Sequence, residues 1–372
     1  MEIWWNKYFG KYNADILYWR MGMIITKTPF RMSFFGGGTD MEDYFKENNG
    51  AVLSTTFDKY CYVNVRHLPR FFDYSIELSY SKMERIVDVL DIEHPAIRNA
   101  MQMLDMHEIR LTYEADLPAR SGIGTSSSFA VGMLNAFYAL KGKYADKKRL
   151  ADEAIYLERV LCAEVGGWQD QIAASFGGFN RIDFHDGSYE VNPVIISPKR
   201  KRELNQNLLM FFTGFTRFSS EVQKLNLNET RSDRKQMLRE MYELVGEAEK
   251  VMSDPSKDLD DFGRLLDHTW NLKRQTGKAI STSSIDELYS RGINAGALGG
   301  KLLGAGGGGF LIFYVQPEFK KSVRRAMKDL MYIPFEFETS GTRVIHYSPE
   351  DYTPKVPENS GGKWNRVEGR EE

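Results

Sequence analysis

Alternating apolar and polar residues predict strands in the first half of the chain. Apolar side chains recur at every second position over residues 61–65, 74–78 and 109–113, which is the period of a half-buried strand. Two continuous apolar runs, at 208–212 and 311–315, predict buried strands later in the chain. Strands are therefore expected on both sides of the middle of the sequence.

Helical periodicity predicts the helices. Residues 129–140 are apolar on nearly every side, which indicates a helix inside a domain. A second helix is predicted over 147–165, where Gly166 and Gly167 would end it, and a capping box at 284–287 predicts the start of a third. One stripe at helical spacing is predicted to face the core: Met237, Leu238, Met241, Leu244, Val245, Ala248 and Val251.

This order of elements predicts an α+β protein with two domains and an active site in the cleft between them. Strands and helices alternate over residues 23–192, the predicted N-terminal domain, and long helices dominate over 193–347, the predicted C-terminal domain. Residues 1–22 are predicted to be an appended extension, and the polar segment 348–372 a flexible tail. A chain of 372 residues, 42% of them hydrophobic, is long enough to bury two cores.

Composition excludes several classes of function. Lysine and arginine number 49 against 51 acidic residues, so no overall positive charge attracts nucleic acid. No apolar run approaches the roughly 20 residues that span a membrane, and a cytoplasmic protein is predicted. Cys61 and Cys162 lie far apart and are predicted to be buried free thiols, and the six histidines show no metal-ligand spacing.

Three glycine-rich segments indicate the chemistry. Residues 117–129 join a predicted strand to a predicted helix through glycines and hydroxyl side chains. Because a helix N-terminus carries unpaired N–H groups and a partial positive charge, this segment indicates a phosphate-binding loop, with a serine-rich N-cap as the alternative. In residues 28–40, Arg31 and Asp40 flank three consecutive glycines, and residues 301–310 contain a third glycine cluster.

Other glycine motifs do not fit these segments. A Walker A loop before Gly300 and Lys301 would need glycine at Ala295 and a hydroxyl residue at Leu302. The Gly304-x-Gly306-x-x-Gly309 pattern matches a dinucleotide fingerprint but leads into a predicted strand, whereas that fingerprint opens a helix. A serine hydrolase elbow around Ser126 would need glycine at position 128, which is serine.

Together the three segments resemble the three motifs of the GHMP small-molecule kinases, in order and spacing. The residues that carry the resemblance are Pro29, Arg31, Gly36 and Asp40, then Pro118, Gly122, Gly124, Ser126 and Ser127, then Gly304, Gly306, Gly308 and Gly309. The match spans roughly residues 23–347. Within the family, the first two motifs most resemble the D-glycero-D-manno-heptose 7-phosphate kinases, followed by the fucokinase-type sugar kinases.

The resemblance implies roles for individual residues. Asp170 matches the catalytic aspartate, and Arg31 the cation beside it, which would stabilise both the ionised aspartate and the transferring phosphoryl group. Glu158 and Ser126 match the magnesium-contacting positions. The implied ATP-binding residues are Pro118, Arg120, Ser121, Gly122, Ile123, Gly124, Thr125, Ser126 and Ser127. The predicted substrate-binding residues are Gly36, Gly37, Gly38, Asp40, Arg217, Gly306 and Gly307.

Three of these residues also have a simpler structural interpretation. Glu158 could be a solvated charge on a helix, and Asp170, near a predicted helix N-terminus, a helix cap. Arg217 follows the strand 208–212 and could either bind a substrate phosphate or pair with Glu221 on the surface.

The implied activity is ATP- and Mg²⁺-dependent phosphorylation of the anomeric hydroxyl of D-glycero-D-manno-heptose 7-phosphate, giving the 1,7-bisphosphate. Gly37 occupies the position at which galactokinases have a glutamate, which argues against a galactokinase and leaves room for a larger or anionic acceptor. The alternatives are a fucokinase-like or other sugar 1-kinase, and a non-catalytic nucleotide- or sugar-binding relative. The anomer, the adenine contacts and the oligomeric state, including a homodimer, stay open.

Overall fold

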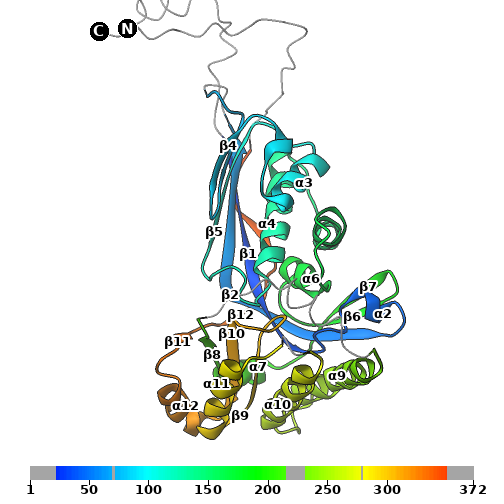
Figure 1. Cartoon of the computed structure of the whole chain (residues 1–372), viewed down its shortest axis with the longest axis vertical. Helices are drawn as coiled ribbons and strands as arrows, with labels where there is room; N and C mark the ends of the chain where they lie inside the picture. Colours follow the sequence, from blue (N-terminus) through cyan, green and yellow to red (C-terminus); the bar gives the residue numbers. More distant parts are fainter. Residues whose placement is uncertain (1–21, 69–71, 215–230, 278–279, 350–372) are drawn as a thin grey trace, which may run out of the picture.

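The computed structural model describes residues 22–68, 72–214, 231–277 and 280–349. Within these ranges the chain forms two sheets, each covered by helices (Figure 1). The larger sheet and its helices make one lobe, and the smaller sheet with the helices of the second half makes the other. The predicted α+β class and two-domain architecture are confirmed.

The larger sheet is built around two long antiparallel strands, β1 (Met23–Phe35) and β2 (Gly50–His67). Its main order among the described strands is β13-β1-β2-β5-β3-β4, and β6 and β12 also pair with β2. The other strands of this sheet are β3 (Ile76–Ser79), β4 (Met83–Ile86), β5 (Ile109–Ala115), β6 (Phe179–His185), β7 (Ser188–Pro193), β12 (Phe337–Glu338) and β13 (Arg343–Ser348).

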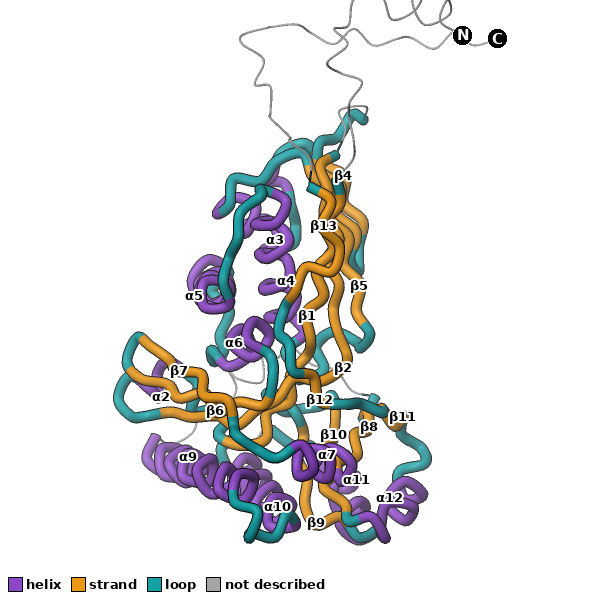
Figure 2. The backbone as a smooth tube through the Cα atoms, turned by 180° about the vertical axis from the view of Figure 1, so that it is seen from behind, coloured by secondary structure: helices purple, strands orange, loops and turns teal. Residues whose placement is uncertain are grey.

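Helices cover one face of the upper part of this sheet (Figure 2). They are α3 (Pro95–Met103), α4 (Thr125–Leu140), α5 (Lys147–Ile155) and α6 (Gln169–Phe176). The short helix α2 (Glu42–Phe45) lies beside β6 and β7, and the short helix η2 (Val89–Asp91) precedes α3. The π-helical turn η3 (Tyr156–Leu161) continues α5. Helix α4 is buried on nearly all sides, as its apolar sequence predicts.

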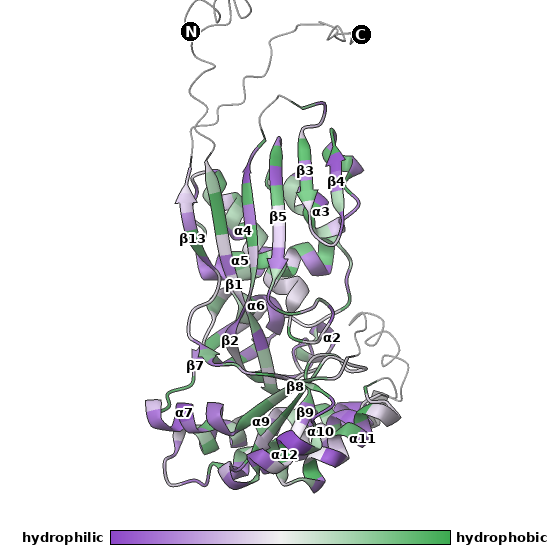
Figure 3. Cartoon of the chain, turned by 90° about the vertical axis from the view of Figure 1, so that its left-hand side faces the viewer, coloured by the Kyte–Doolittle hydropathy of each residue, from purple (hydrophilic) through white to green (hydrophobic). Residues whose placement is uncertain are grey.

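The smaller sheet has the order β11-β8-β10-β9 among the described residues. Its strands are β8 (Leu208–Phe212), β9 (Ala297–Leu302), β10 (Phe310–Val315) and β11 (Met331–Ile333). The helices of this lobe are α7 (Pro198–Asn207), α9 (Arg231–Ser253), α10 (Asp260–Gln275), α11 (Ser283–Asn294), α12 (Lys320–Ala326) and the short η4 (Pro317–Phe319). Figure 3 shows hydrophobic residues along β1 and β2, and mainly hydrophilic residues on α7 and α12.

One hydrophobic core joins the two lobes. Phe34 of β1 packs edge-on against Phe262 of α10, with ring centroids 5.3 Å apart, and stacks on Phe179 of β6 at 5.8 Å. The same cluster includes the α9 stripe, in which Leu238, Met241, Leu244, Val245, Ala248 and Val251 are buried. The lower end of β1 is therefore held by both lobes, and the candidate site is built there.

Several boundaries differ from the sequence prediction. The helix predicted over 147–165 ends at Leu161, where Ala163 adopts a left-handed conformation. Helix α11 begins at Ser283 and is capped by Thr282, whose hydroxyl accepts from the Ile285 N–H, two residues before the predicted cap. Cys162 is only half-buried.

The C-terminal strands also depart from the predicted division of the chain. The sequence predicts a second domain that runs to residue 347, whereas β12 pairs with β2 and β13 with β1, both in the larger sheet. This pairing joins residues from opposite ends of the described chain. No periodicity within β13 itself can indicate which strand it meets.

Candidate active site

An ion pair between Arg31 and Asp170 lies at the centre of the candidate site. The guanidinium is bidentate, with Nε 2.8 Å from Oδ1 and an Nη atom 2.9 Å from Oδ2 of the carboxylate. The other Nη donates to the carbonyl oxygen of Gly122 at 2.6 Å. The Arg31 side chain is only 5% exposed, whereas that of Asp170 is 26% exposed, so the carboxylate remains accessible to a ligand.

Local backbone structure explains how these side chains meet. The β1–β2 register shifts between Pro29 and Phe30, and such bulges redirect the side chains that follow. The N–H of Arg31 then donates to the carbonyl of Ile123 at 3.1 Å, which docks the strand against the predicted phosphate loop. Asp170 lies in the first turn of α6, where the helix dipole favours a negative charge. Because its carboxylate is paired with Arg31, Asp170 does not act as a helix cap.

The predicted phosphate loop leads into the N-terminus of α4. Gly124 is the N-cap residue, adopts a φ of +75°, and supplies no side chain to cap the helix. A Cβ atom on Gly124 would lie 3.2 Å from the Arg31 side chain and 3.5 Å from the Asp170 carboxylate. The helix N-terminus therefore opens beside the Arg31–Asp170 pair, in the arrangement that favours an anion.

The third glycine segment packs against this loop. A Cβ atom on Gly122 would lie 2.3 Å from the carbonyl oxygen of Leu303, and one on Gly309 would lie 2.1 Å from that of Ser121. Gly307 donates its N–H to the carbonyl of Ile280 at 3.0 Å. Gly122 and Gly309 therefore serve close backbone packing between the lobes, and Gly307 a contact within the second lobe. The sequence could not distinguish such packing from substrate contact.

We expect Gly122→Ala to destabilise the fold, because Gly122 has a φ of +82° as well as the contact with Leu303. A left-handed alanine costs about 1 kcal/mol, and the backbone clash adds to that cost. Gly142→Ala is the matched control, since Gly142 has a φ of +64° with nothing within 4 Å. Thermal unfolding should show a larger fall in Tm for Gly122→Ala, and equal falls would contradict the packing role.

Glu158 lies on the π-helical turn and is almost fully buried. Its Oε2 accepts a hydrogen bond from the Ser127 hydroxyl at 2.6 Å and another from the Gln171 side-chain amide. Glu158 is therefore not a solvated helix-face charge. Ser126, the other predicted magnesium contact, is exposed in the first turn of α4. No group of three or more His, Cys, Asp or Glu side chains gathers as a metal cluster in the described ranges.

Asp40 is held in a buried turn next to the ion pair. Its Oδ1 accepts from the Gly38 N–H at 2.8 Å, and a Cβ atom on Gly167 would lie 1.8 Å from its Oδ2. Gly167, predicted to end a helix, instead leaves space for this carboxylate. Burial raises the pKa of Asp40, partly opposed by the backbone N–H groups of Gly38 and Gln169, and the Asp170 charge raises it further.

The three glycines before Asp40 differ in their surroundings. A Cβ atom on Gly36, which has a φ of +78°, would lie 1.8 Å from the Ala51 carbonyl oxygen. Gly38 has a φ of +107° and holds Asp40 through its N–H. A Cβ atom on Gly37 would meet nothing closer than 3.8 Å. A side chain at Gly37 would therefore clash with nothing, unlike one at Gly36.

Two buried lysines were missed by the sequence analysis. Lys273 of α10 donates its ammonium to the Gly304 carbonyl, and Lys301 of β9 donates to the Phe34 carbonyl at 2.7 Å. Burial and the neighbouring Arg31 lower the pKa of Lys273 to about 8, opposed by Asp40 and Asp170. Burial lowers the pKa of Lys301 well below the ordinary value, and the charges of Lys273 and Arg31 lower it further, opposed by Asp40. A lysine in a charged helix such as α10 usually lies on the surface, so the sequence contained no sign that Lys273 is buried beside the ion pair.

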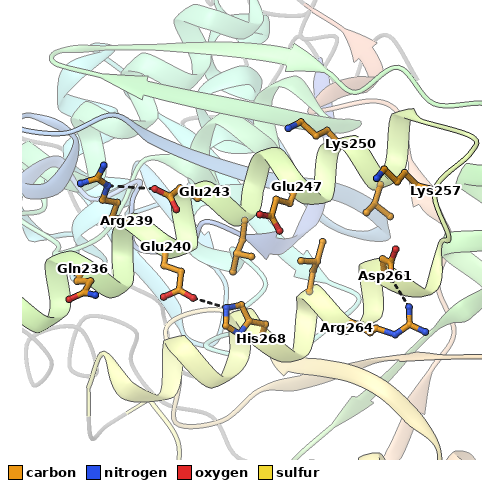
Figure 4. Close-up of a pocket in the computed structure, with 13 residues that line it drawn as sticks. Gln236, Arg239, Glu240, Glu243, Glu247, Lys250, Lys257, Asp261, Arg264 and His268 are labelled. Carbon is orange, nitrogen blue, oxygen red and sulfur yellow. Dashed lines mark hydrogen bonds and ion pairs between the residues drawn. The ribbon is translucent and has the colours of Figure 1, made fainter.

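Other features lie apart from this cluster. Arg217, predicted to bind substrate, lies outside the described residues. A groove of about 960 Å³ between α9 and α10 is lined by charged side chains that pair with one another, such as Glu240 with His268 at 2.7 Å (Figure 4). None of the predicted site residues that the structure describes lines this groove. No described helix is both long and apolar enough to cross a bilayer.

Comparison with known families decides the identity of the fold. Residues 89–178 match the model described as GHMP kinases N terminal domain, and residues 235–333 match GHMP kinases C terminal. The chain belongs to the GHMP kinase family. The first match contains Glu158 and Asp170, and the second contains Lys273 and the third glycine segment. The family and the kinase activity predicted from the sequence are thus confirmed for this GHMP kinase.

The relatives of this GHMP kinase include sugar kinases. It is 29% identical over 338 residues to the D-glycero-alpha-D-manno-heptose 7-phosphate kinase of Campylobacter jejuni, covering 87% of this chain and 99% of that protein. It is 25% identical over 331 residues to the bifunctional fucokinase/GDP-fucose pyrophosphorylase of Arabidopsis thaliana, covering 81% of this chain and 31% of that protein. A crystal structure described as a D-glycero-D-manno-heptose 1-phosphate kinase from Bacteroides thetaiotaomicron shares the fold, with a TM-score of 0.69, 23% identity, and coverage of 86% of this chain and 98% of that one.

Proposed function

We propose that this GHMP kinase is an ATP-dependent sugar kinase that phosphorylates the anomeric hydroxyl of D-glycero-D-manno-heptose 7-phosphate, giving the 1,7-bisphosphate. The observation that carries the proposal is the bidentate Arg31–Asp170 pair beside the N-terminus of α4. It presents an accessible carboxylate and a fixed cation next to a helix end suited to phosphate.

In this proposal Asp170 orients the acceptor hydroxyl and receives its proton as the oxygen attacks the γ-phosphorus of ATP. The bond between that phosphorus and the bridging oxygen breaks, and ADP leaves. Arg31 and Lys273 supply positive charge beside the transferring group, in a buried environment where such charges act strongly. The loop residues 118–127 hold the ATP phosphates through backbone N–H groups at the start of α4.

Magnesium fits the residues around Glu158. The buried Glu158 carboxylate lies against the first turn of α4, where the exposed Ser126 hydroxyl offers a second hard oxygen. Magnesium prefers one or two protein oxygens together with phosphate and water. When bound there, it would neutralise charge on the ATP phosphates. Ser127 and Gln171 hold the carboxylate in position through hydrogen bonds to Oε2.

Glu158→Gln and Ser126→Ala are expected to raise the magnesium concentration needed for half-maximal rate, by about 10-fold for the loss of the charged ligand. Ser127→Ala should have a smaller effect, because Ser127 only positions the carboxylate. The measurement is initial rate against free Mg²⁺ at saturating ATP. If Glu158→Gln and Ser126→Ala both keep the wild-type magnesium dependence, the metal site lies elsewhere.

The choice of acceptor rests on similarity and on local space. The heptose kinase relative aligns over 87% of this chain and 99% of its own, and Gly37 carries no side chain near Asp40. Arg31 and Lys273 beside Asp170 supply positive charge for the phosphates of ATP, so the choice of a phosphorylated acceptor rests on the heptose kinase relative. The names of the two heptose kinase relatives place the substrate phosphate at different positions, so the position is part of the proposal.

A fucokinase-like activity is the second candidate, because the fucokinase relative aligns over 81% of this chain. Release of ADP should be measured across heptose 7-phosphate, heptose 1-phosphate, unphosphorylated heptose and L-fucose, and the product located by phosphorus NMR. We expect the highest kcat/KM with heptose 7-phosphate and a new phosphate on C1. Equal activity on unphosphorylated sugars would reject the heptose phosphate assignment and favour the fucokinase-like one.

A further inference from the structure

Two buried polar atoms beside the Arg31–Asp170 pair have no hydrogen-bond partner in the described structure. They are Oγ of Ser33, a residue 4% exposed, and Oε1 of Gln169, a residue 9% exposed. An unpaired buried polar group typically costs about 1–3 kcal/mol, so such groups in folded proteins are normally paired by a ligand or an ordered water. Two of them close together therefore indicate a binding surface.

Both side chains lie beside Gly37. The Cβ position of Gly37 lies 3.8 Å from Oγ of Ser33 and 3.9 Å from Nε2 of Gln169. A side chain there would make ordinary van der Waals contact with both polar atoms, and the φ of Gly37 does not demand glycine. The absence of a side chain at Gly37 thus leaves the hydroxyl and the amide uncovered on this side.

The chain places these two polar side chains next to the reacting groups. Ser33 follows Arg31 by two residues on β1, so both side chains leave the same face of the strand. Gln169 precedes Asp170 at the start of α6, and its backbone N–H also supports the Asp40 carboxylate. One surface therefore continues from the Asp170 carboxylate through Gln169 and Ser33 to Asp40.

We propose that Ser33 and Gln169 bind ring hydroxyls of the acceptor sugar, with Gly37 leaving both groups uncovered. A serine hydroxyl and a carboxamide each donate and accept, as a sugar hydroxyl does, and neither carries charge. This surface suits the neutral, hydroxylated part of the acceptor, and the phosphate of the acceptor binds elsewhere. The inference rests on the proposed function and extends it to two residues that select the sugar.

Ser33→Ala separates a binding role from a structural one. The Ser33 hydroxyl has no hydrogen-bond partner among the described residues, so its removal should leave Tm unchanged or higher. The KM for the acceptor should rise roughly 2- to 10-fold, because one hydrogen bond to the sugar is lost. The KM for ATP should stay constant. The matched control is Ser175→Ala on α6, where an equally buried hydroxyl donates to the Lys147 carbonyl. The control should lower Tm and leave the acceptor KM unchanged.

Gln169→Met and Gly37→Ala test the rest of the surface. A methyl group at Gly37 would lie 3.8 Å from Oγ of Ser33 and 3.9 Å from Nε2 of Gln169 without a clash, so the protein should fold, but it would cover both groups and the acceptor KM should rise. Gly246→Ala on α9 is the control, because its Cβ would also meet only a distant atom, at 4.0 Å. Gly246→Ala should keep the wild-type acceptor KM.

Deoxy analogues of the acceptor give a readout that a structural role would not change. The wild-type enzyme should discriminate against the analogue that lacks the hydroxyl bound by Ser33, and Ser33→Ala should lose most of that discrimination. If both Ser33→Ala and Gln169→Met keep the wild-type acceptor KM and analogue preferences, the inference is overturned while the heptose kinase proposal stands. If the wild-type enzyme does not phosphorylate the heptose phosphate, the proposed function fails, and the same variants are then assayed with the sugar that is accepted.

Discussion

Asp170→Asn is expected to reduce turnover by about 100-fold or more while leaving the fold and ATP binding intact. The amide keeps an oxygen that can accept from Arg31, so the side chain stays in place, but it can neither receive a proton nor orient the acceptor hydroxyl as a carboxylate does. Single-turnover kinetics should place the loss in the chemical step, and nucleotide titration should give a dissociation constant for ATP close to that of the wild type.

Asp146→Asn is the matched control for this variant. Asp146 is also an aspartate at a helix N-terminus, and its carboxylate accepts from the Arg149 N–H at 2.8 Å as the N-cap of α5. Asparagine caps a helix as well as aspartate does, so turnover should not change. Near-native turnover of Asp170→Asn would remove Asp170 from the mechanism.

Lys273→Met is expected to lower kcat/KM by about 10- to 100-fold at pH 7, which is the effect of losing one charge-assisted contact. The pKa of Lys273 is about 8, so the wild-type rate should also fall as pH rises through 8 and the ammonium loses its proton. The charged groups that interact electrostatically with Lys273 are Arg31, Asp40, Asp170 and Lys301. Lys273→Arg, which stays charged, should retain activity above pH 8.

The lowered pKa of Lys273 also predicts that stability rises with pH, whereas the rate falls. The folded pKa of about 8 lies below the ordinary value of 10.5, so between these values the unfolded chain binds more protons than the folded one. The free energy of unfolding should therefore gain a contribution as pH rises from about 8 to 10.5, and Lys273→Met should lack this gain.

A rate profile for Lys273→Met that still falls near pH 8 would assign the titration to another group.

Sequence patterns predicted the elements better than the contacts between them. The period-two runs identify β2 and β5, and the apolar stripe identifies the buried face of α9, because these signals lie within one segment. The end of α5 was misplaced, because a π-helical turn at residues 156–161 leaves no mark in the hydrophobic period. The true cap of α11 was missed because Thr282 precedes two serines, each of which could serve as well.

The candidate site depends on contacts that local patterns do not contain. Arg31 and Asp170 were paired through the family resemblance, since nothing in either segment specifies its partner. Ser33 and Gln169 look like ordinary polar residues, and their importance lies in the partners that they lack. The glycine clusters indicated close backbone approach, but the structure was needed to show that Gly122 approaches another loop while Gly37 lies beside two unpaired polar side chains.

The return of β13 to the larger sheet has a consequence for the order in which the protein can mature. While a ribosome makes the second lobe, the outer edge of β1 has no partner, because residues 343–348 have not yet been synthesised. The segment before β13 also binds α6 through the Thr342 N–H and the Ala174 carbonyl at 2.8 Å. The helix that carries Asp170 thus gains this support only after residue 342 has been made. Nascent or truncated chains without these residues therefore expose an unpaired edge of β1, prone to aggregation, and lack one contact that holds α6.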